Sequence, residues 1–216
     1  MPRPSLVRAV VMLLALVAAM ALAGAPSPAR ADWDARGFRH NGLLIRLSVG
    51  AGFNTATLHG TDPSTTLSGV GGMASFAFGG IIADNLALNA DLFAMTVFEP
   101  KVSVGDADLG DAKDTTLTIG GLGVGATYYI MPINMYFAAS VGVATGTVRT
   151  KRGGVTIEGE SDPGFGASFM IGKEWWVGRQ WGLGVAAQAI LASLPDKDDE
   201  RVTAFGIGIL FSATYN

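Results

Sequence analysis

The sequence predicts an all-β protein, an eight-stranded antiparallel up-and-down transmembrane β-barrel. Three observations lead to this fold class: apolar residues alternate with small or polar ones, long polar connections alternate with short turns, and the chain contains 30 glycines. Side chains on a strand point to opposite faces with a period of two, so an apolar outer face over a small, polar inner face suits a membrane-spanning wall. Glycine destabilises a helix interior by roughly 1 kcal/mol relative to alanine, which argues against a helical bundle.

An export signal is expected at the N-terminus. Arg3 and Arg8 precede an apolar run from about Ala9 to Ala23, and Ala29-Arg30-Ala31 offers small residues at the two positions that a signal peptidase reads. We place cleavage after Ala31. The alternative is an uncleaved membrane anchor. Cysteine is absent, so neither a lipid anchor nor a disulfide framework is expected.

Removing residues 1–31 leaves a short periplasmic segment, 32–42, and the barrel, 43–216. The removed segment holds 3 of the 15 basic residues and none of the 18 acidic ones, so the mature net charge is 12 − 18 = −6. Phosphate backbones are held by an excess of Lys and Arg. No nucleic-acid partner is therefore expected.

Eight strands are expected in the barrel region. The last is the clearest, because Phe205, Ile207, Ile209 and Phe211 share one face while Gly206, Gly208, Leu210 and Ser212 share the other. The strands before it are expected at 43–54, 69–82, 86–98, 116–131, 135–148, 164–176 and 181–192. In each strand the outward set is mainly Leu, Val, Ile, Phe and Ala, and the inward set is rich in Gly, Ser, Thr and Asn.

The connections alternate in length. Long polar loops are expected at 55–68, 99–115, 149–163 and 193–201, and short turns at 83–85, 132–134 and 177–180. Bacterial outer-membrane barrels have short periplasmic turns and longer extracellular loops, so both termini are expected on the periplasmic side. Aromatic residues cluster at that boundary, as in a girdle at the headgroup level: Tyr128, Tyr129, Tyr136, Trp175, Trp176, Trp181 and Tyr215.

Two other structures share part of this sequence pattern. The apolar stretch Gly121 to Gly146 is long enough for a transmembrane helix, but its two-residue period and the central Pro132 and Asn134 favour a hairpin. An exported soluble β-sandwich has the same period, and period two does not reveal which face is wet. The face made of Gly, Ser, Ala, Thr and Asn suits a narrow lumen better than a solvent surface.

With this pattern, the chain resembles the small eight-stranded outer-membrane barrels of the OmpA/OmpX type over about residues 38–216. The resemblance rests on the strand pattern, the loop asymmetry, the hairpin edge Lys173-Glu174-Trp175-Trp176 and the aromatic C-terminal strand. It implies location in the cell outer membrane, contact with its lipid and lipopolysaccharide, and assembly by the barrel assembly machinery. Such families usually finish on an aromatic residue, whereas Tyr215 is followed here by Asn216. No peptidoglycan-binding domain is expected after the barrel, so cell-wall tethering is not part of what the resemblance implies.

The lumen of an eight-stranded barrel is just wide enough to be filled by side chains or to hold one small ligand. Arg46, Asp91 and Glu174 fall inward in the expected register near the periplasmic end, and we expect them to form a charged, hydrogen-bonded plug. The predicted role is structural or surface-interactive, with the external loops as the contact surface. The alternative is a narrow port for small hydrophobic molecules, as in OmpW-type barrels. It needs an apolar inner pocket, which could be lined by Leu44, Met73, Phe93, Met95, Met170 and Ile190.

No enzyme and no cofactor is expected. His59, Asp62 and Ser64 lie together in an external loop, but nothing in the sequence holds them in a catalytic geometry. The stretch Gly120-Gly121-Leu122-Gly123 is not a nucleotide fingerprint, because no helix follows it. The acidic loop fails the EF-hand pattern, since positions six and twelve counted from Asp106 hold Asp111 and Leu117 rather than Gly and Glu. Solvated acidity is therefore preferred to a metal site, or to a loose divalent contact with lipopolysaccharide, for Asp106, Asp108, Asp111 and Asp114.

Overall fold

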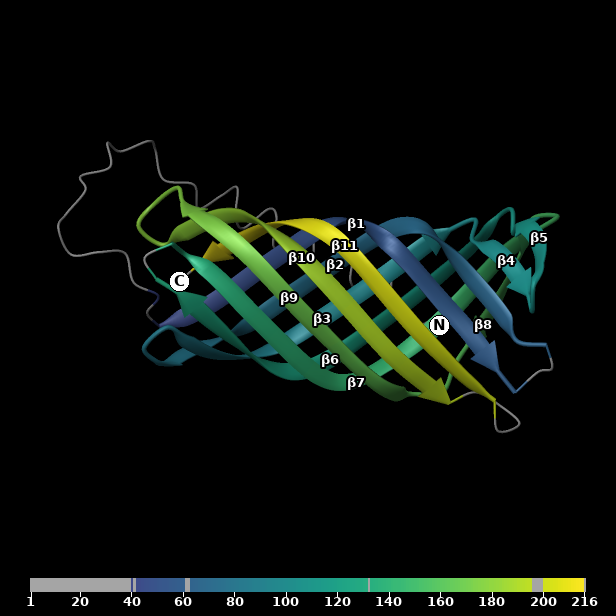
Figure 1. Ribbon diagram of the computed structural model, residues 1–216, viewed down its shortest axis with the longest axis horizontal. Coiled ribbons are helices and arrows are strands. Elements are labelled where there is room, and N and C mark those ends of the chain that lie inside the picture. The colour runs from purple at the N-terminus through teal and green to yellow at the C-terminus, as the bar shows by residue number, and fades with distance from the viewer. Residues whose placement is uncertain (1–39, 41, 61–62, 132, 196–199, 216) are drawn as a thin grey trace. The chain divides into compact units, whose positions relative to one another are not determined.

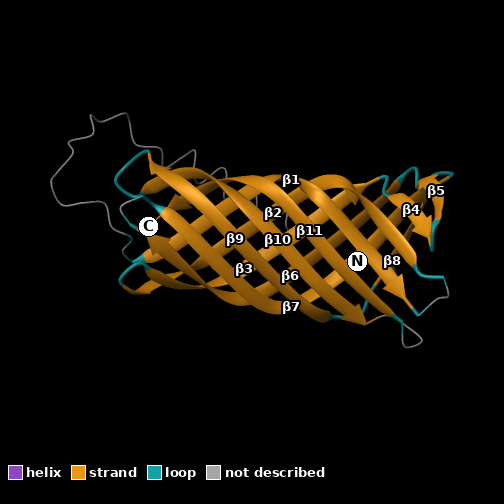
Figure 2. Ribbon diagram, viewed as in Figure 1, coloured by secondary structure: helices purple, strands orange, loops and turns teal. Residues whose placement is uncertain are grey.

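The computed structural model describes residues 40, 42–60, 63–131, 133–195 and 200–215. The expected signal peptide and most of the expected periplasmic segment 32–42 lie outside the described residues. Within the described part the chain forms an 11-stranded antiparallel sheet (Figures 1 and 2). Its strands are β1 (Leu43–His59), β2 (Thr65–Ala83), β3 (Leu86–Phe98), β4 (Lys101–Val104), β5 (Ala107–Asp111), β6 (Thr115–Ile130), β7 (Met135–Arg152), β8 (Val155–Glu160), β9 (Gly164–Trp176), β10 (Trp181–Pro195) and β11 (Arg201–Tyr215).

Eight of these strands close into a barrel in the order β1-β11-β10-β9-β7-β6-β3-β2, and β2 pairs again with β1. Phe53 of β1, for example, faces Ile207 of β11 on one side and Val70 of β2 on the other. Closure removes the sheet edges that an open sheet presents. The predicted fold class is confirmed, and the β-sandwich alternative is wrong. The segment considered for a helix forms parts of β6 and β7.

Among the described residues, none belongs to a helix long and apolar enough to cross a membrane.

The barrel wall has an apolar outer face and an inner face whose side chains are mostly buried. Val124 and Phe211 point outward and are 71% and 73% exposed, whereas Leu210 and Ser212, on either side of Phe211, are buried in the lumen. This alternation reproduces the inward and outward faces that the sequence predicts. An exposed apolar surface on all sides of a closed barrel is stable in a hydrocarbon layer, because no unpaired backbone group faces the lipid.

The short turns require left-handed backbone conformations. Asn85 and Asn134 have φ angles of 62° and 51° in the connections β2–β3 and β6–β7. Asparagine tolerates this region better than most side chains, because its short amide hydrogen-bonds to nearby backbone. These two residues therefore explain why both hairpins reverse within a few residues.

The long connections are more ordered than the sequence analysis expected. The segment 99–115 contains the hairpin of β4 and β5, the segment 149–163 contains β8, and β1 continues to His59. β4 extends the pairing of β2, and β8 extends that of β7. The turn between β7 and β8 is Gly153-Gly154, with φ angles of 56° and 81°, which match the type I′ hairpin turn. These strands lie at one end of the barrel, opposite the short turns (Figure 1). The predicted long polar loops therefore contain short strands, because these charged segments pair with neighbouring strands that composition does not reveal.

Candidate functional site

Three charged residues meet the lumen from different strands. Arg46 of β1, Asp91 of β3 and Glu174 of β9 are 2%, 6% and 1% exposed. Each side chain points inward because consecutive residues of a strand face opposite sides, and the residues before and after it point outward. Buried ions persist mainly when they are paired or hydrogen-bonded, so the partners of these groups decide what the site can do.

Serine and threonine hydroxyls hold the two carboxylates. Ser75 and Ser140 donate to Asp91 at 2.9 and 2.6 Å. On the other side of the lumen, Thr214 and Ser212 donate to Glu174 Oε1 at 2.5 and 3.2 Å. The sequence analysis missed these hydroxyl partners. They could have been found from the inward Ser and Thr positions only with the strand register known.

Arg46 contacts an aromatic ring rather than a carboxylate. Its guanidinium carbon lies 4.5 Å from the centroid of the Tyr136 ring, and no ion pair joins it to Asp91 or Glu174 in the described barrel. The charges of both carboxylates nevertheless act on the guanidinium. The arrangement is one cation near two carboxylates that are each held by hydroxyls. That Arg46, Asp91 and Glu174 stabilise one another as a single network stays a prediction.

Aromatic rings pack together at the short-turn end of the lumen. His40, which precedes β1, stacks on Tyr129 with centroids 3.5 Å apart and lies 5.0 Å from the ring of Trp176. Its Nε2 hydrogen-bonds to Asn134 Oδ1 at 2.8 Å. The sequence analysis gave His40 no role, because a lone histidine before a strand carries no periodic signal. Its ring packs on Tyr129 at this end of the barrel.

The expected aromatic girdle is only partly correct. Tyr129 and Tyr136 are fully buried in the lumen rather than lipid-facing, whereas Tyr128 and Trp175 are exposed on the outer wall. Consecutive strand residues face opposite sides, so the pairs Tyr128-Tyr129 and Trp175-Trp176 each contribute one outward ring. Proximity to a turn therefore identified the end of the barrel at which these residues lie, but it did not show which of them face outward.

Large inward side chains lie over inward glycines. The Phe93 ring covers Gly121 and Gly166, and a Cβ built on Gly166 would lie 2.9 Å from Phe93 Cζ. Tyr136 covers Gly172 in the same way, with its Cε1 2.5 Å from a built Cβ. The inward glycines are thus the spaces into which the largest lumen side chains pack.

The residues considered for an apolar port are buried inside the barrel. All six belong to one buried hydrophobic cluster and are at most 5% exposed: Leu44, Met73, Phe93, Met95, Met170 and Ile190.

The residues considered for catalysis or metal binding in the long connections make contacts with neighbouring strands. His59 hydrogen-bonds to Thr203 Oγ1 at 2.8 Å, and Asp62 lies outside the described residues. Asp108 pairs with Lys101 at 2.6 Å across β4 and β5, and this hydrogen bond lowers the pKa of Asp108. No cluster of three His, Cys, Asp or Glu residues that could hold a metal ion occurs in the described part of the chain.

A closed barrel with an apolar outer wall, buried polar and apolar side chains inside, short turns at one end and longer hairpins at the other defines a transmembrane β-barrel of the bacterial outer-membrane class. No family model and no curated protein matches the sequence.

Similar solved structures include the outer membrane protein OprG from Pseudomonas aeruginosa, with 13% identity, coverage of 85% of this chain and 100% of that chain, and a TM-score of 0.46. Ail, the attachment invasion locus protein of Yersinia pestis, has 9% identity, coverage of 80% and 99%, and a TM-score of 0.42. Neisserial surface protein A has 12% identity, coverage of 76% and 95%, and a TM-score of 0.41. At these values the likeness concerns the fold alone.

Proposed function

We propose that this protein is a non-enzymatic outer-membrane barrel with a plugged lumen and a structural or surface-contact role. It would be exported with cleavage after Ala31, assembled by the barrel assembly machinery and surrounded by lipid and lipopolysaccharide. The observation that carries the proposal is the burial of inward side chains along the barrel, from Tyr129 and Arg46 near one mouth to Leu194 near the other. A water-filled channel would leave such side chains accessible.

The external strands supply the contact surface. Every residue of β5 and β8 is exposed, and these strands carry the large apolar side chains Leu109, Val155 and Ile157. Both strands end the pairing on their side of the sheet, since β5 pairs β4 and β8 pairs β7 in the described structure. Edge strands with exposed apolar residues are typical of sites that pair with other molecules.

Planar-bilayer conductance of the refolded protein tests the plugged lumen. A folded barrel, verified by the heat-modifiable shift on a gel, is expected to give no steady openings. Steady small openings that a hydrophobic solute blocks would overturn the proposal in favour of the narrow port.

Cysteine labelling tests the orientation. The chain has no cysteine, so a single introduced thiol reports one position. Arg152→Cys, at the exposed tip of β7, is expected to react with a membrane-impermeant maleimide on intact cells. The matched variant Arg179→Cys, in the exposed short turn between β9 and β10, is expected to react only after the outer membrane is permeabilised. The reverse pattern would place the long hairpins in the periplasm.

A further inference from the structure

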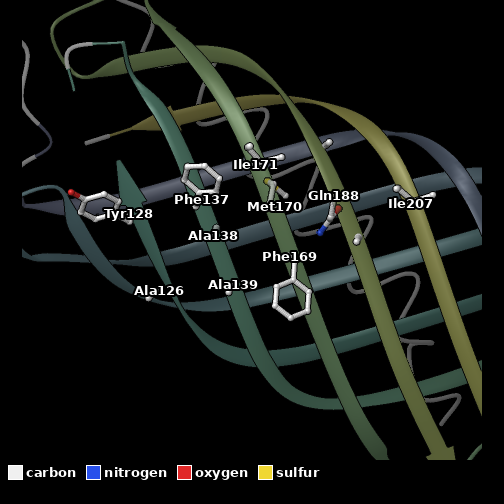
Figure 3. Close-up of a pocket in the computed structure, with 12 residues that line it drawn as sticks. Ala126, Tyr128, Phe137, Ala138, Ala139, Phe169, Met170, Ile171, Gln188 and Ile207 are labelled. Carbon is white, nitrogen blue, oxygen red and sulfur yellow. The ribbon is translucent and has the colours of Figure 1, made fainter. Parts of the chain in front are cut away.

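The outer wall carries a hollow over β6, β7, β9, β10 and β11 (Figure 3). It has a volume of about 530 Å³ and is bordered by Phe137, Phe169 and Ile207. The small side chains Ala139 and Ala189 flank Phe169 on the neighbouring strands, because the register pairs both of them with Phe169. Alternation of large and small outward residues thus leaves a recess in the wall.

The recess continues toward the periplasmic end. A second hollow, of about 250 Å³, shares Ile171 and Ala187 with the first and reaches Lys173. On β9 these residues follow one another outward in the order Phe169, Ile171, Lys173, toward the short turn after Trp176. The two hollows therefore form one apolar groove with a cation at its end.

Lys173 lies near the short-turn end of the outer wall. Its Nζ donates to the Ile133 carbonyl oxygen in the β6–β7 turn and lies 5.6 Å from the ring centroid of Trp175, which is exposed on the outer wall. An ammonium group has three donors, so the bond to Ile133 leaves others for an anion. Aromatic rings such as that of Trp175 are enriched at the headgroup level.

We propose that this groove, which we name the wall groove, binds an anionic phospholipid of the periplasmic leaflet. One acyl chain lies along Phe169, Ile171 and Ala187, and the phosphate accepts a hydrogen bond from Lys173 Nζ. The apolar lining is continuous with the lipid-facing wall, and the cation Lys173 at its end is complementary to a lipid headgroup with a net negative charge. A zwitterionic headgroup also carries a phosphate, but its own ammonium group offsets that charge and is repelled by Lys173. The site is independent of whether the lumen conducts.

Native mass spectrometry of the detergent-solubilised protein tests the site, with phosphatidylglycerol and phosphatidylethanolamine of identical acyl chains as probes. The unaltered protein is expected to retain phosphatidylglycerol in preference. Lys173→Gln is expected to weaken that retention by about ten-fold, the effect of losing one charge-assisted hydrogen bond. Ala187→Phe fills the groove where the two hollows join and is expected to abolish retention of both lipids.

Two control variants accompany these changes. Ala90→Phe makes the same change on the outward face of β3, outside the groove, and Arg179→Gln removes a cation that does not line it. Neither is expected to alter retention, and the heat-modifiable shift verifies that each variant folds. Equal retention of the two lipids by the unaltered protein, or unchanged retention in Lys173→Gln and Ala187→Phe, would overturn the proposal.

Discussion

Replacing Arg46 with Met is expected to lower the free energy of unfolding of the barrel by about 3–5 kcal/mol, the range observed when one partner of buried charges is removed. The change leaves the carboxylates of Asp91 and Glu174 buried without a nearby positive charge. It also removes the contact between the guanidinium and the Tyr136 ring. Urea unfolding of the protein in lipid vesicles, followed by tryptophan fluorescence, measures the loss.

Two further variants separate charge from packing. Arg46→Lys keeps the charge and is expected to lose less stability than Arg46→Met. In Arg46→Met combined with Glu174→Gln, the two losses should not add, because the second change removes a carboxylate that the first left unbalanced. Strict additivity would show that Arg46 and Glu174 are separately solvated and would refute the expected network of Arg46, Asp91 and Glu174.

Replacing Phe93 with Ala is expected to lower the free energy of unfolding by about 3–5 kcal/mol, as for other buried phenylalanines. The Phe93 ring is buried and crosses the lumen to cover Gly121 and Gly166, which have no side chains that could fill the space. The same unfolding measurement applies. An unchanged unfolding midpoint would show that the lumen closes around the missing ring or was not packed there.

A compensating change tests the packing directly. Gly121→Ala alone is expected to destabilise the barrel, because its Cβ would overlap the Phe93 ring. In the Phe93→Ala background that overlap is absent, so Gly121→Ala should cost little or recover part of the stability. If Gly121→Ala costs the same in both backgrounds, its effect arises from the nearby Val143 carbonyl oxygen, 3.0 Å from the built Cβ, and not from Phe93.

Sequence periodicity was sufficient to predict the strands of the barrel wall, but it did not predict the short strands within the connections. β3 and β9 begin and end where the sequence analysis placed them, because alternating side chains stop at turn residues such as Asn85 and Gly178. β4, β5 and β8 were missed, because a short charged strand is stabilised by the neighbour with which it pairs. For β8 that neighbour is the extension of β7, which the sequence analysis had assigned to a loop.

The fold class, the two faces of each strand and the inward position of Arg46, Asp91 and Glu174 could be predicted from the sequence, because they follow from a period of two along a single strand. The hydroxyls that hold the carboxylates, the rings that pack at the short-turn end and the glycines under Phe93 and Tyr136 became known from the folded barrel. The same holds for the wall groove, which depends on residues of five strands. The physical reason is that closure of the barrel brings together side chains far apart in the chain, and their contacts depend on the register of every strand between them.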